Sequence, residues 1–266
     1  MISVFKTNWR VYVIEAWALG MFMISAVFFT ILIENPAMPV RGFIASALVR
    51  RMLMGLAMGL TAVLLIYSRW GKKSGAHMNP AVTLTFLALK RIHVADALYY
   101  ILFQFIGGLF AVLLMKMLFP QMIKDPSVNY AVTVPGSAGA VTAFWAEALI
   151  SFLLMITILF AGNSKNMKYT GYFAGFLLFI YITFEAPFSG MSINPARTVA
   201  SAIPALTYSF VWIYFVAPVG SMLLAGLLYK FVYIIKNGNC INMMLHLNGN
   251  CEASETYTPG EAKNYN

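Results

Sequence analysis

The sequence contains one motif twice, as Ser74-Gly75-Ala76-His77-Met78-Asn79-Pro80-Ala81 and as Ser189-Gly190-Met191-Ser192-Ile193-Asn194-Pro195-Ala196. In both copies Ser-Gly precedes Asn-Pro-Ala by the same spacing, and a threonine follows, Thr83 or Thr198. Two copies in matched frames indicate an internal repeat.

Each motif predicts the start of a short helix. Asn is a favoured N-cap residue, because its side-chain oxygen accepts a hydrogen bond from the first turn. Pro is favoured at the first helical position, where its missing N–H is not needed. The helical patterns that follow, Ala81–Leu89 and Ala196–Ala202, are too short to cross a bilayer, which takes roughly 20 residues.

The segments around the motifs are long and apolar. The chain of 266 residues is 61% hydrophobic and 10% charged, whereas about a quarter of the residues of a soluble domain are charged. Six runs have the length of a bilayer span: Val11–Ile33, Ala45–Tyr67, Val94–Leu118, Ala140–Ala161, Tyr169–Ala186 and Tyr208–Tyr229. We therefore expect an all-α membrane protein with six transmembrane helices. We expect no cleavable signal peptide, because the first run is long and lacks a small-residue cleavage pattern.

The flanks of the two motifs repeat as well. Small residues four apart allow helices to approach closely in lipid. Such pairs lie in the spans before and after each motif, as Gly55/Gly59, Gly107/Ala111, Gly171/Gly175 and Ser221/Ala225. Each half also opens with a span that carries one acid, Glu15 or Glu147.

Each half is therefore expected to hold three spans, with a motif loop between the second and the third. An odd number of spans reverses the second half, so the repeat is inverted. The expected divisions are a first repeat over residues 1–136, a second over 137–236 and a polar cytoplasmic tail over 237–266. The motif loops then enter the membrane from opposite faces as two re-entrant half-helices, whose N-termini meet near the midplane.

The net charge of +9 does not indicate nucleic acid, because the Lys and Arg residues lie between the spans. Most of these 18 residues fall on the inner side if both termini are cytoplasmic, as the positive-inside rule favours. Cys240 and Cys251 lie in the tail, where a structural disulfide is not expected. His246 lies between them and leaves a metal site as an alternative, but the spacing fits no compact zinc pattern. We expect no metal and no cofactor.

The meeting point of the half-helices has electrostatic consequences. Each helix N-terminus carries roughly half a positive charge, so the pair repels cations, including a migrating proton. The amides of Asn79 and Asn194 can donate hydrogen bonds to one passing oxygen. The carbonyls of two extended segments can face the lumen as acceptors: Gly75, Ala76, His77 and Met78 in one, and Gly190, Met191, Ser192 and Ile193 in the other.

The paired motifs, the second followed by Arg197, resemble the signature of the aquaporin (major intrinsic protein) family over about residues 8–232. The resemblance implies a pore in each subunit, a homotetramer and a location in the cell membrane, with membrane lipid around it. It also implies that Glu15 and Glu147 accept hydrogen bonds from the loop backbone. His77 matches a pore-side histidine of the family, and its alternative role is a packing histidine.

The family places four residues at an outer selectivity filter, and here they fall on Met58, Ile182, Met191 and Arg197. The position of Met58 requires one inserted residue, which leaves Gly59 as its rival. Water-selective members usually carry Phe and His at the first two positions, so this ring is more apolar than usual. The alternative is that the Met and Ile side chains only pack.

Other positions resemble the water-conducting branch, namely Thr198, Ala202 and the pair Tyr214-Phe215. The leading interpretation is a passive channel for water that excludes protons and ions. The alternatives are a facilitator of small neutral solutes, such as glycerol, ammonia, urea or metalloid acids, and a non-conducting protein that organises membranes. An enzyme is disfavoured, because no phosphate-binding loop and no pair of carboxylates at catalytic spacing is present. We therefore assign no catalytic residue.

Overall fold

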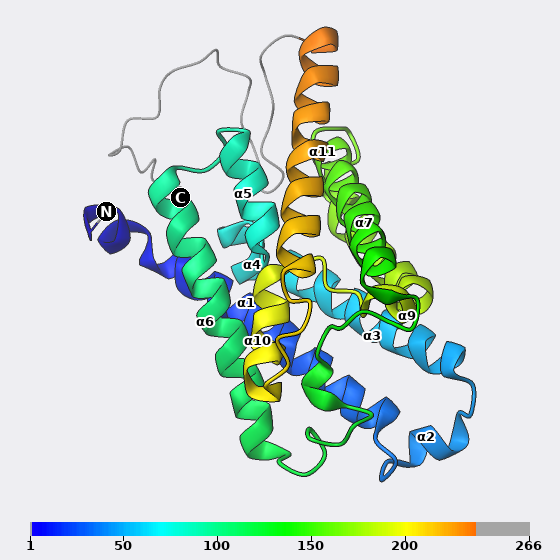
Figure 1. The fold of residues 1–266 in the computed structure, drawn as a ribbon. Helices are drawn as coiled ribbons and strands as arrows, with labels where there is room; N and C mark the ends of the chain where they lie inside the picture. Colours follow the sequence, from blue (N-terminus) through cyan, green and yellow to red (C-terminus); the bar gives the residue numbers. More distant parts are fainter. Residues whose placement is uncertain (1, 238–266) are drawn as a thin grey trace.

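The computed structural model describes the backbone of residues 2–237 and the side chains of residues 3–232 (Figure 1). Within this part of the chain all regular structure is helical, and six helical segments are long and apolar enough to cross a membrane. They are α1 (Ile2–Glu34), α3 (Ala47–Tyr67), α6 (Val94–Leu118), α7 (Gly139–Gly162), the run Met167–Ser189 and α11 (Ile213–Asn237). The prediction of an all-α membrane protein is confirmed.

Shorter helices complete the described chain. They are α2 (Pro39–Phe43), α4 (Arg69–Ser74), α5 (Pro80–Ala88), η1 (Asn129–Ala131), η2 (Met167–Tyr169) and α10 (Pro195–Ala205). The fifth long run is not one regular helix: α8 (Thr170–Ile180) passes into the π-helix η3 (Tyr181–Glu185) and then α9 (Ala186–Ser189). The predicted tail from residue 238 onward, with Cys240, His246 and Cys251, lies outside the described residues.

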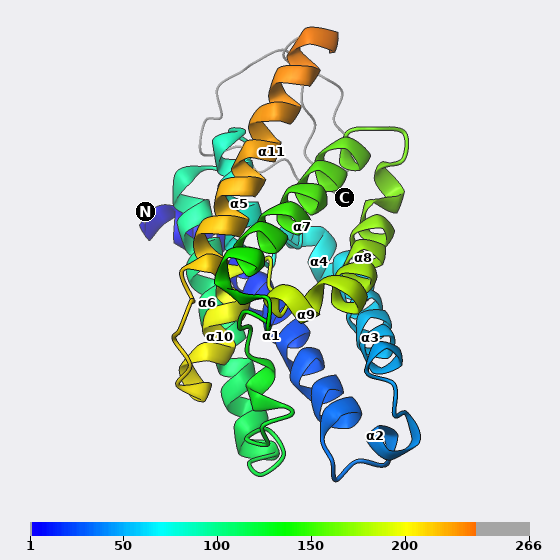
Figure 2. The ribbon, with the colours of Figure 1, turned by 45° about the vertical axis from the view of Figure 1, so that its right-hand side comes forward.

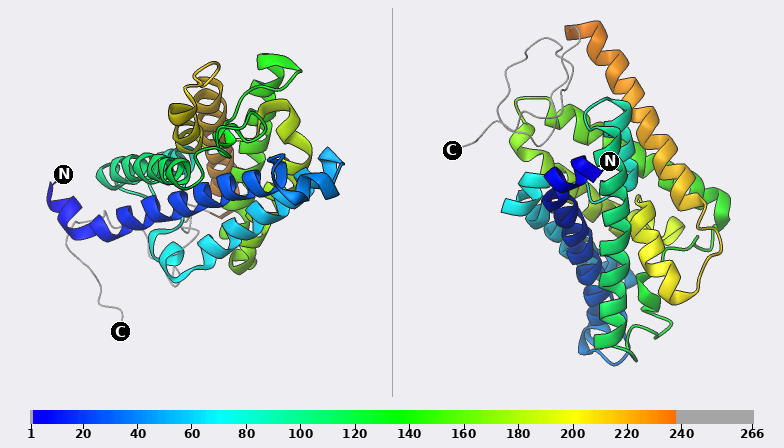
Figure 3. Two further views of the ribbon diagram at one scale, coloured as in Figure 1. Left: turned by 90° about the horizontal axis from the view of Figure 1, so that it is seen from below. Right: turned by 90° about the vertical axis from the view of Figure 1, so that its left-hand side faces the viewer.

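The long helices pair in a pattern that the two halves share (Figures 2 and 3). In the first half α1 packs along α6, and in the second half α7 packs along α11. The middle helices of the halves, α3 and α8, pack on each other. At their crossing a Cβ on Gly59 would lie 2.5 Å from the carbonyl oxygen of Gly175, so the two backbones touch. This contact is the close approach that the small residues predicted.

The outer surface of the described helices is apolar. Leu64, Phe110 and Leu227 are 71%, 67% and 60% exposed, on three different long helices. Exposed tryptophans, Trp70 and Trp212, lie at opposite ends of the helices, as in the aromatic belts of membrane proteins. Such a surface is stable in lipid and would aggregate in water.

The two short helices α5 and α10 lie between the long ones. α5 packs on α11 and α6, and α10 packs mainly on α6. Each short helix thus contacts long helices of both halves, which brings the two motif segments to the centre of the bundle (Figure 2).

Candidate functional site

Both motifs form the predicted helix starts. The Asn79 Oδ1 atom accepts a hydrogen bond from the Ala81 N–H at 2.8 Å, and Pro80 occupies the first turn of α5. The Asn194 Oδ1 atom accepts from the N–H groups of Ala196 and Arg197 at 3.0 and 3.2 Å, with Pro195 in the first turn of α10. The caps follow from local sequence alone, because each asparagine satisfies N–H groups that a helix start leaves unpaired.

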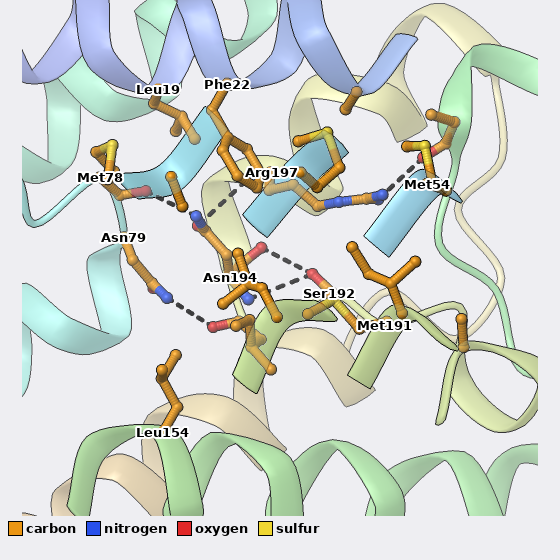
Figure 4. A pocket seen from close by; sticks show the side chains of 18 of the residues that line it. Leu19, Phe22, Met54, Met78, Asn79, Leu154, Met191, Ser192, Asn194 and Arg197 are labelled. Atoms are coloured by element: carbon orange, nitrogen blue, oxygen red, sulfur yellow. Dashed lines mark hydrogen bonds between the residues drawn. The ribbon is translucent and has the colours of Figure 1, made fainter. Parts of the chain in front are cut away.

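The side-chain amides then connect the two motifs (Figure 4). The Asn79 Nδ2 atom donates to the Ile193 carbonyl at 2.7 Å, and the Asn194 Nδ2 atom donates to the Met78 carbonyl at 2.7 Å. Each asparagine is thereby bonded to the residue that precedes the other. An amide NH₂ group carries two hydrogens, and one of each pair remains for a further acceptor.

The segment before the first motif helix is a curled backbone that holds a buried carboxylate. Gly75, Ala76 and Met78 have positive φ angles of 90°, 46° and 48°. This curl turns consecutive N–H groups inward, so His77 and Met78 donate to Glu15 at 3.0 and 2.7 Å. Backbone conformations of this kind are strained for residues other than Gly, and the carboxylate offsets that strain.

The second motif repeats this arrangement. Ser192 and Ile193 donate their N–H groups to Glu147 at 2.6 and 2.7 Å, and the Ser189 hydroxyl donates at 2.8 Å. Gly190, Met191 and Ile193 have positive φ angles. Glu15 receives the equivalent hydroxyl bond from Ser74 at 2.7 Å. The expected hydrogen bonds to Glu15 and Glu147 are present in the structure.

Three polar residues were not assigned to this framework from the sequence, although Tyr214 was noted there for another reason. Tyr100 and Tyr214 donate their hydroxyl groups to the carbonyls of Ser74 and Ser189, each at 2.6 Å. Gln104 donates to Glu15 at 2.8 Å. The two tyrosines follow their serines by 26 and 25 residues, so a comparison of the spans after each motif could have found them.

A cavity of about 350 Å³ runs along the two motif segments. Predicted site residues that line it are Met58, Gly75, Ala76, His77, Met78, Asn79, Ile182, Gly190, Met191, Ser192, Ile193, Asn194 and Arg197. The prolines and alanines of the motifs, Pro80, Ala81, Pro195 and Ala196, do not line it, because they form the buried first turns of α5 and α10. Apolar side chains such as Phe22 and Leu154 form its remaining wall.

The four residues expected at the filter all face this cavity. Arg197 reaches across it and donates from Nη1 to the Ala131 carbonyl at 2.9 Å. Met58 is 1% exposed and lines the cavity, whereas its rival Gly59 contacts Gly175 of α8. Ile182 projects from the π-helix η3. All four residues therefore line the cavity, and Gly59 is not among its lining residues.

His77 combines the two roles that the sequence left open. Its Nδ1 atom lies 3.1 Å from the Thr83 hydroxyl, and its ring stacks on Phe86 with centroids 4.9 Å apart. It also lines the cavity. Its packing therefore fixes the orientation in which the imidazole meets the cavity.

The outer part of the cavity contains a second arginine that the sequence did not point to. Arg51 lines the cavity, and its Nε atom donates to the Thr183 carbonyl at 3.0 Å, beside Ile182. Glu34 and Ser127 line the same end. Which face of α3 turns inward depends on its packing against α8, so the sequence pattern alone could not assign Arg51.

A surface carboxylate lies next to this end. Ser127 donates to Asp125 from its hydroxyl at 2.6 Å and from its backbone N–H at 2.9 Å. These bonds hold the pKa of Asp125 below its usual value, so the group remains charged at neutral pH. Within the described residues no group of three or more His, Cys, Asp and Glu side chains could hold a metal ion.

The chain is similar in sequence to curated proteins named as aquaporins. A probable aquaporin, NIP4-2, of Arabidopsis thaliana is 35% identical over 178 residues, which cover 65% of this chain and 60% of that protein. Aquaporin-4 of Mus musculus is 32% identical over 185 residues, which cover 68% of this chain and 56% of that protein. The chain thus spans less than two thirds of the length of these curated relatives.

A solved structure shows the same fold. The X-ray structure of the aquaglyceroporin from Plasmodium falciparum superposes with a TM-score of 0.69 and covers 84% of this chain and 96% of that one, at 17% identity. The family model described as Major intrinsic protein matches residues 3–229. The chain is therefore a member of the major intrinsic protein family.

Proposed function

We propose that this protein is a passive channel that conducts water down an osmotic gradient and excludes protons and ions. The observation that carries the proposal is the crossed pair of asparagines at the cavity wall. Each amide has one hydrogen in a bond to the opposite loop and one available for a solute. Two donors fixed side by side bind the oxygen of a single water, which then cannot relay a proton along a chain of its neighbours.

Ion exclusion rests on charges that the fold sets in place. The N-terminal ends of α5 and α10 meet at the asparagines, and each contributes a partial positive charge. Arg197 adds a full charge to the cavity wall, and its hydrogen bond to Ala131 holds it there. We propose Met58, Ile182, Met191 and Arg197 as the selectivity filter, and the backbone carbonyls of the two curled segments as acceptors along the path.

The second candidate is a facilitator of small neutral solutes. The observation that favours it is the chemistry of the ring, in which three of the four side chains are apolar and two are flexible methionines. Such a ring offers less resistance to a carbon-bearing solute than one built with His. The names of the relatives include both aquaporins and an aquaglyceroporin.

We further propose the arrangement of the chain in the membrane. The two halves are inverted three-span repeats, residues 1–136 and 137–236, with α5 and α10 as re-entrant half-helices. Both termini are cytoplasmic, and the protein is a homotetramer of the cell membrane. The shared packing pattern of the two halves and the exposed apolar surface support this arrangement.

Stopped-flow light scattering on proteoliposomes tests the function. Under a sucrose gradient we expect vesicles with the protein to shrink several-fold faster than empty vesicles. The comparison variant is Ile182→Trp, whose large ring should narrow the cavity and slow this shrinkage. Equal rates for the protein and for empty vesicles would remove the channel proposal. A glycerol gradient separates the candidates: glycerol flux comparable to water flux would favour the facilitator.

A further inference from the structure

A second cavity, of about 630 Å³, shares one lining residue, His77, with the cavity of the proposed conduction path. It is enclosed by α4, the end of α5, the start of α6 and the N-terminal part of α1. These segments lie at the end of the molecule where α11 also ends (Figure 1). Its polar lining consists of Asn8, Lys73, Ser74, His77, Lys90, Arg91, His93, Asp96 and Tyr100.

Positive charge converges on this cavity. Lys73, Lys90 and Arg91 come from two different segments, the last turn of α4 and the connection from α5 to α6. The single acid, Asp96, accepts hydrogen bonds from Tyr12 at 2.5 Å and from Asn8 at 3.0 Å. Both bonds fall on the Oδ1 atom, and in the described part of the chain neither lysine forms an ion pair.

The backbone presents one of these cations, Lys90, in a conformation that costs energy. Lys90 has a φ angle of 57°, in the left-handed region that favours Gly. Hydrogen bonds from Lys90 to Leu87 and from Arg91 to Phe86 close the turn at 2.9 and 2.8 Å. A lysine rather than a glycine at this turn places a charge at the cavity rim.

We propose that this cavity binds a phosphate-bearing anion. Ammonium and guanidinium groups that converge on one site are the chemistry that recognises phosphate oxygens. The positive-inside rule accounts for cations at this end, but not for the convergence of three of them on one cavity whose lining contains a single acid. The ligand is either the headgroup of an anionic lipid or a soluble phosphate.

The site lies against the back of the loop that lines the conduction path. Ser74 and His77 line this cavity, and His77 lines both cavities. The Tyr100 hydroxyl, also in the lining, donates to the Ser74 carbonyl. A bound anion would therefore contact the segment that carries the first motif.

The test measures binding, which does not depend on conduction. The full chain is placed in nanodiscs of phosphatidylcholine with or without phosphatidylglycerol, and native mass spectrometry counts the retained lipids. Titration of the phosphatidylcholine nanodiscs with inorganic phosphate, followed by calorimetry, forms the second arm. The variant is Lys73→Met with Lys90→Met. The matched control is Lys72→Met with Lys165→Met, which removes two cations outside the cavity lining.

We expect the native chain to retain phosphatidylglycerol over phosphatidylcholine. The variant should lose affinity by roughly 25-fold, since each of the two cations near the surface contributes about fivefold. The control should bind as the native chain does. Retention of lipid alone identifies a headgroup, and binding of phosphate alone identifies a soluble ligand. Absence of both, or an equal loss in variant and control, overturns the proposal.

Discussion

At the scale of single residues, Arg197 and Ile182 shape the cavity in different ways. Arg197 contributes charge, donors and length, and its position depends on one hydrogen bond to Ala131. Ile182 contributes a wall that cannot swing away, because branching at Cβ restricts its side chain. Their substitutions should therefore change different properties of the channel.

Replacing Arg197 with Val should widen the ring and remove its charge. We expect urea permeability to rise by about an order of magnitude, which corresponds to a barrier lowered by ~1.4 kcal/mol. Stopped-flow measurements under urea gradients check this. Arg197→Lys is the control, since it keeps the charge and should remain impermeable to ions. Unchanged selectivity of the Val variant would place the constriction elsewhere.

Replacing Ile182 with Gly should open the rigid wall and raise glycerol flux several-fold, while Ile182→His should add a donor and lower glycerol flux. The control is Phe184→Ala on the same π-helix, because Phe184 is 58% exposed on the outer surface. Glycerol uptake by proteoliposomes is the measurement. If Phe184→Ala changes glycerol flux as much as Ile182→Gly does, position 182 has no special role.

The sensitivity of water flux to mercurials should depend on the residue at position 191. The cysteines of the chain, Cys240 and Cys251, lie outside the described residues, and Met191 lines the cavity. Thioether binds mercuric ion far more weakly than thiolate, so the native water flux should resist mercury. Met191→Cys should become inhibited by more than about half, whereas Met117→Cys, on a residue 71% exposed on α6, should not. Strong inhibition of the native protein would contradict this assignment.

At the scale of helices, the contact between α3 and α8 permits a direct test of packing. A Cβ on Gly59 would meet the Gly175 carbonyl oxygen at 2.5 Å, whereas a Cβ on Gly220 of α11 meets nothing within 4 Å. We expect Gly59→Ala to lower the free energy of unfolding by about 1–3 kcal/mol, as overpacking of a core does, and Gly220→Ala to leave it unchanged. Thermal unfolding in detergent measures the stability of both variants. An equal loss of stability in the two would show that the close contact between α3 and α8 does not restrict residue 59.

The sequence predicts the start of a helix well where neighbouring residues determine it, and less well where the apolar pattern alone is the guide. The starts of α5 and α10 are local, since Asn caps and Pro opens the helix, and both were predicted within one residue. Helix α1 was expected from Val11 but begins at Ile2, because Lys6 and Arg10 interrupt the apolar run without interrupting the helix. Helix α11 begins at Ile213 rather than Tyr208, and the turn before it packs as an irregular segment.

Other features of the site depend on tertiary packing. The regular helix gives way to a π-helix at Tyr181–Glu185, just before Pro187, which lacks the N–H that a regular helix would donate to the Thr183 carbonyl. The resemblance still placed Ile182, Met191 and Arg197, because their distances from Asn194 are fixed along the chain. Arg51 and Gln104 were not found, since their helices face inward only after packing.

At the scale of the whole molecule, the meeting of two helix N-termini with Arg197 predicts the absence of ionic current. In a planar bilayer the protein should add no proton or K⁺ conductance to the background, beside measurable water flux in vesicles. The comparison is the Arg197→Val variant, which lacks the charge of Arg197. Of the variants discussed, it should be the first to show ion conductance. Channel-like steps from the native protein would contradict the proposed exclusion mechanism.

The crossed asparagines also set the order in which the protein can be completed during translation. The acceptor of the Asn79 amide lies 114 residues later in the chain, and the donor to Met78 lies 116 residues later. At synthesis rates of about 5–20 residues per second, roughly ten seconds separate the two motifs. During that interval the nascent first half presents an unpaired carbonyl and an amide inside the bilayer, where water or a chaperone of the insertion machinery must satisfy them. The conduction path can therefore close only after the second motif has left the ribosome.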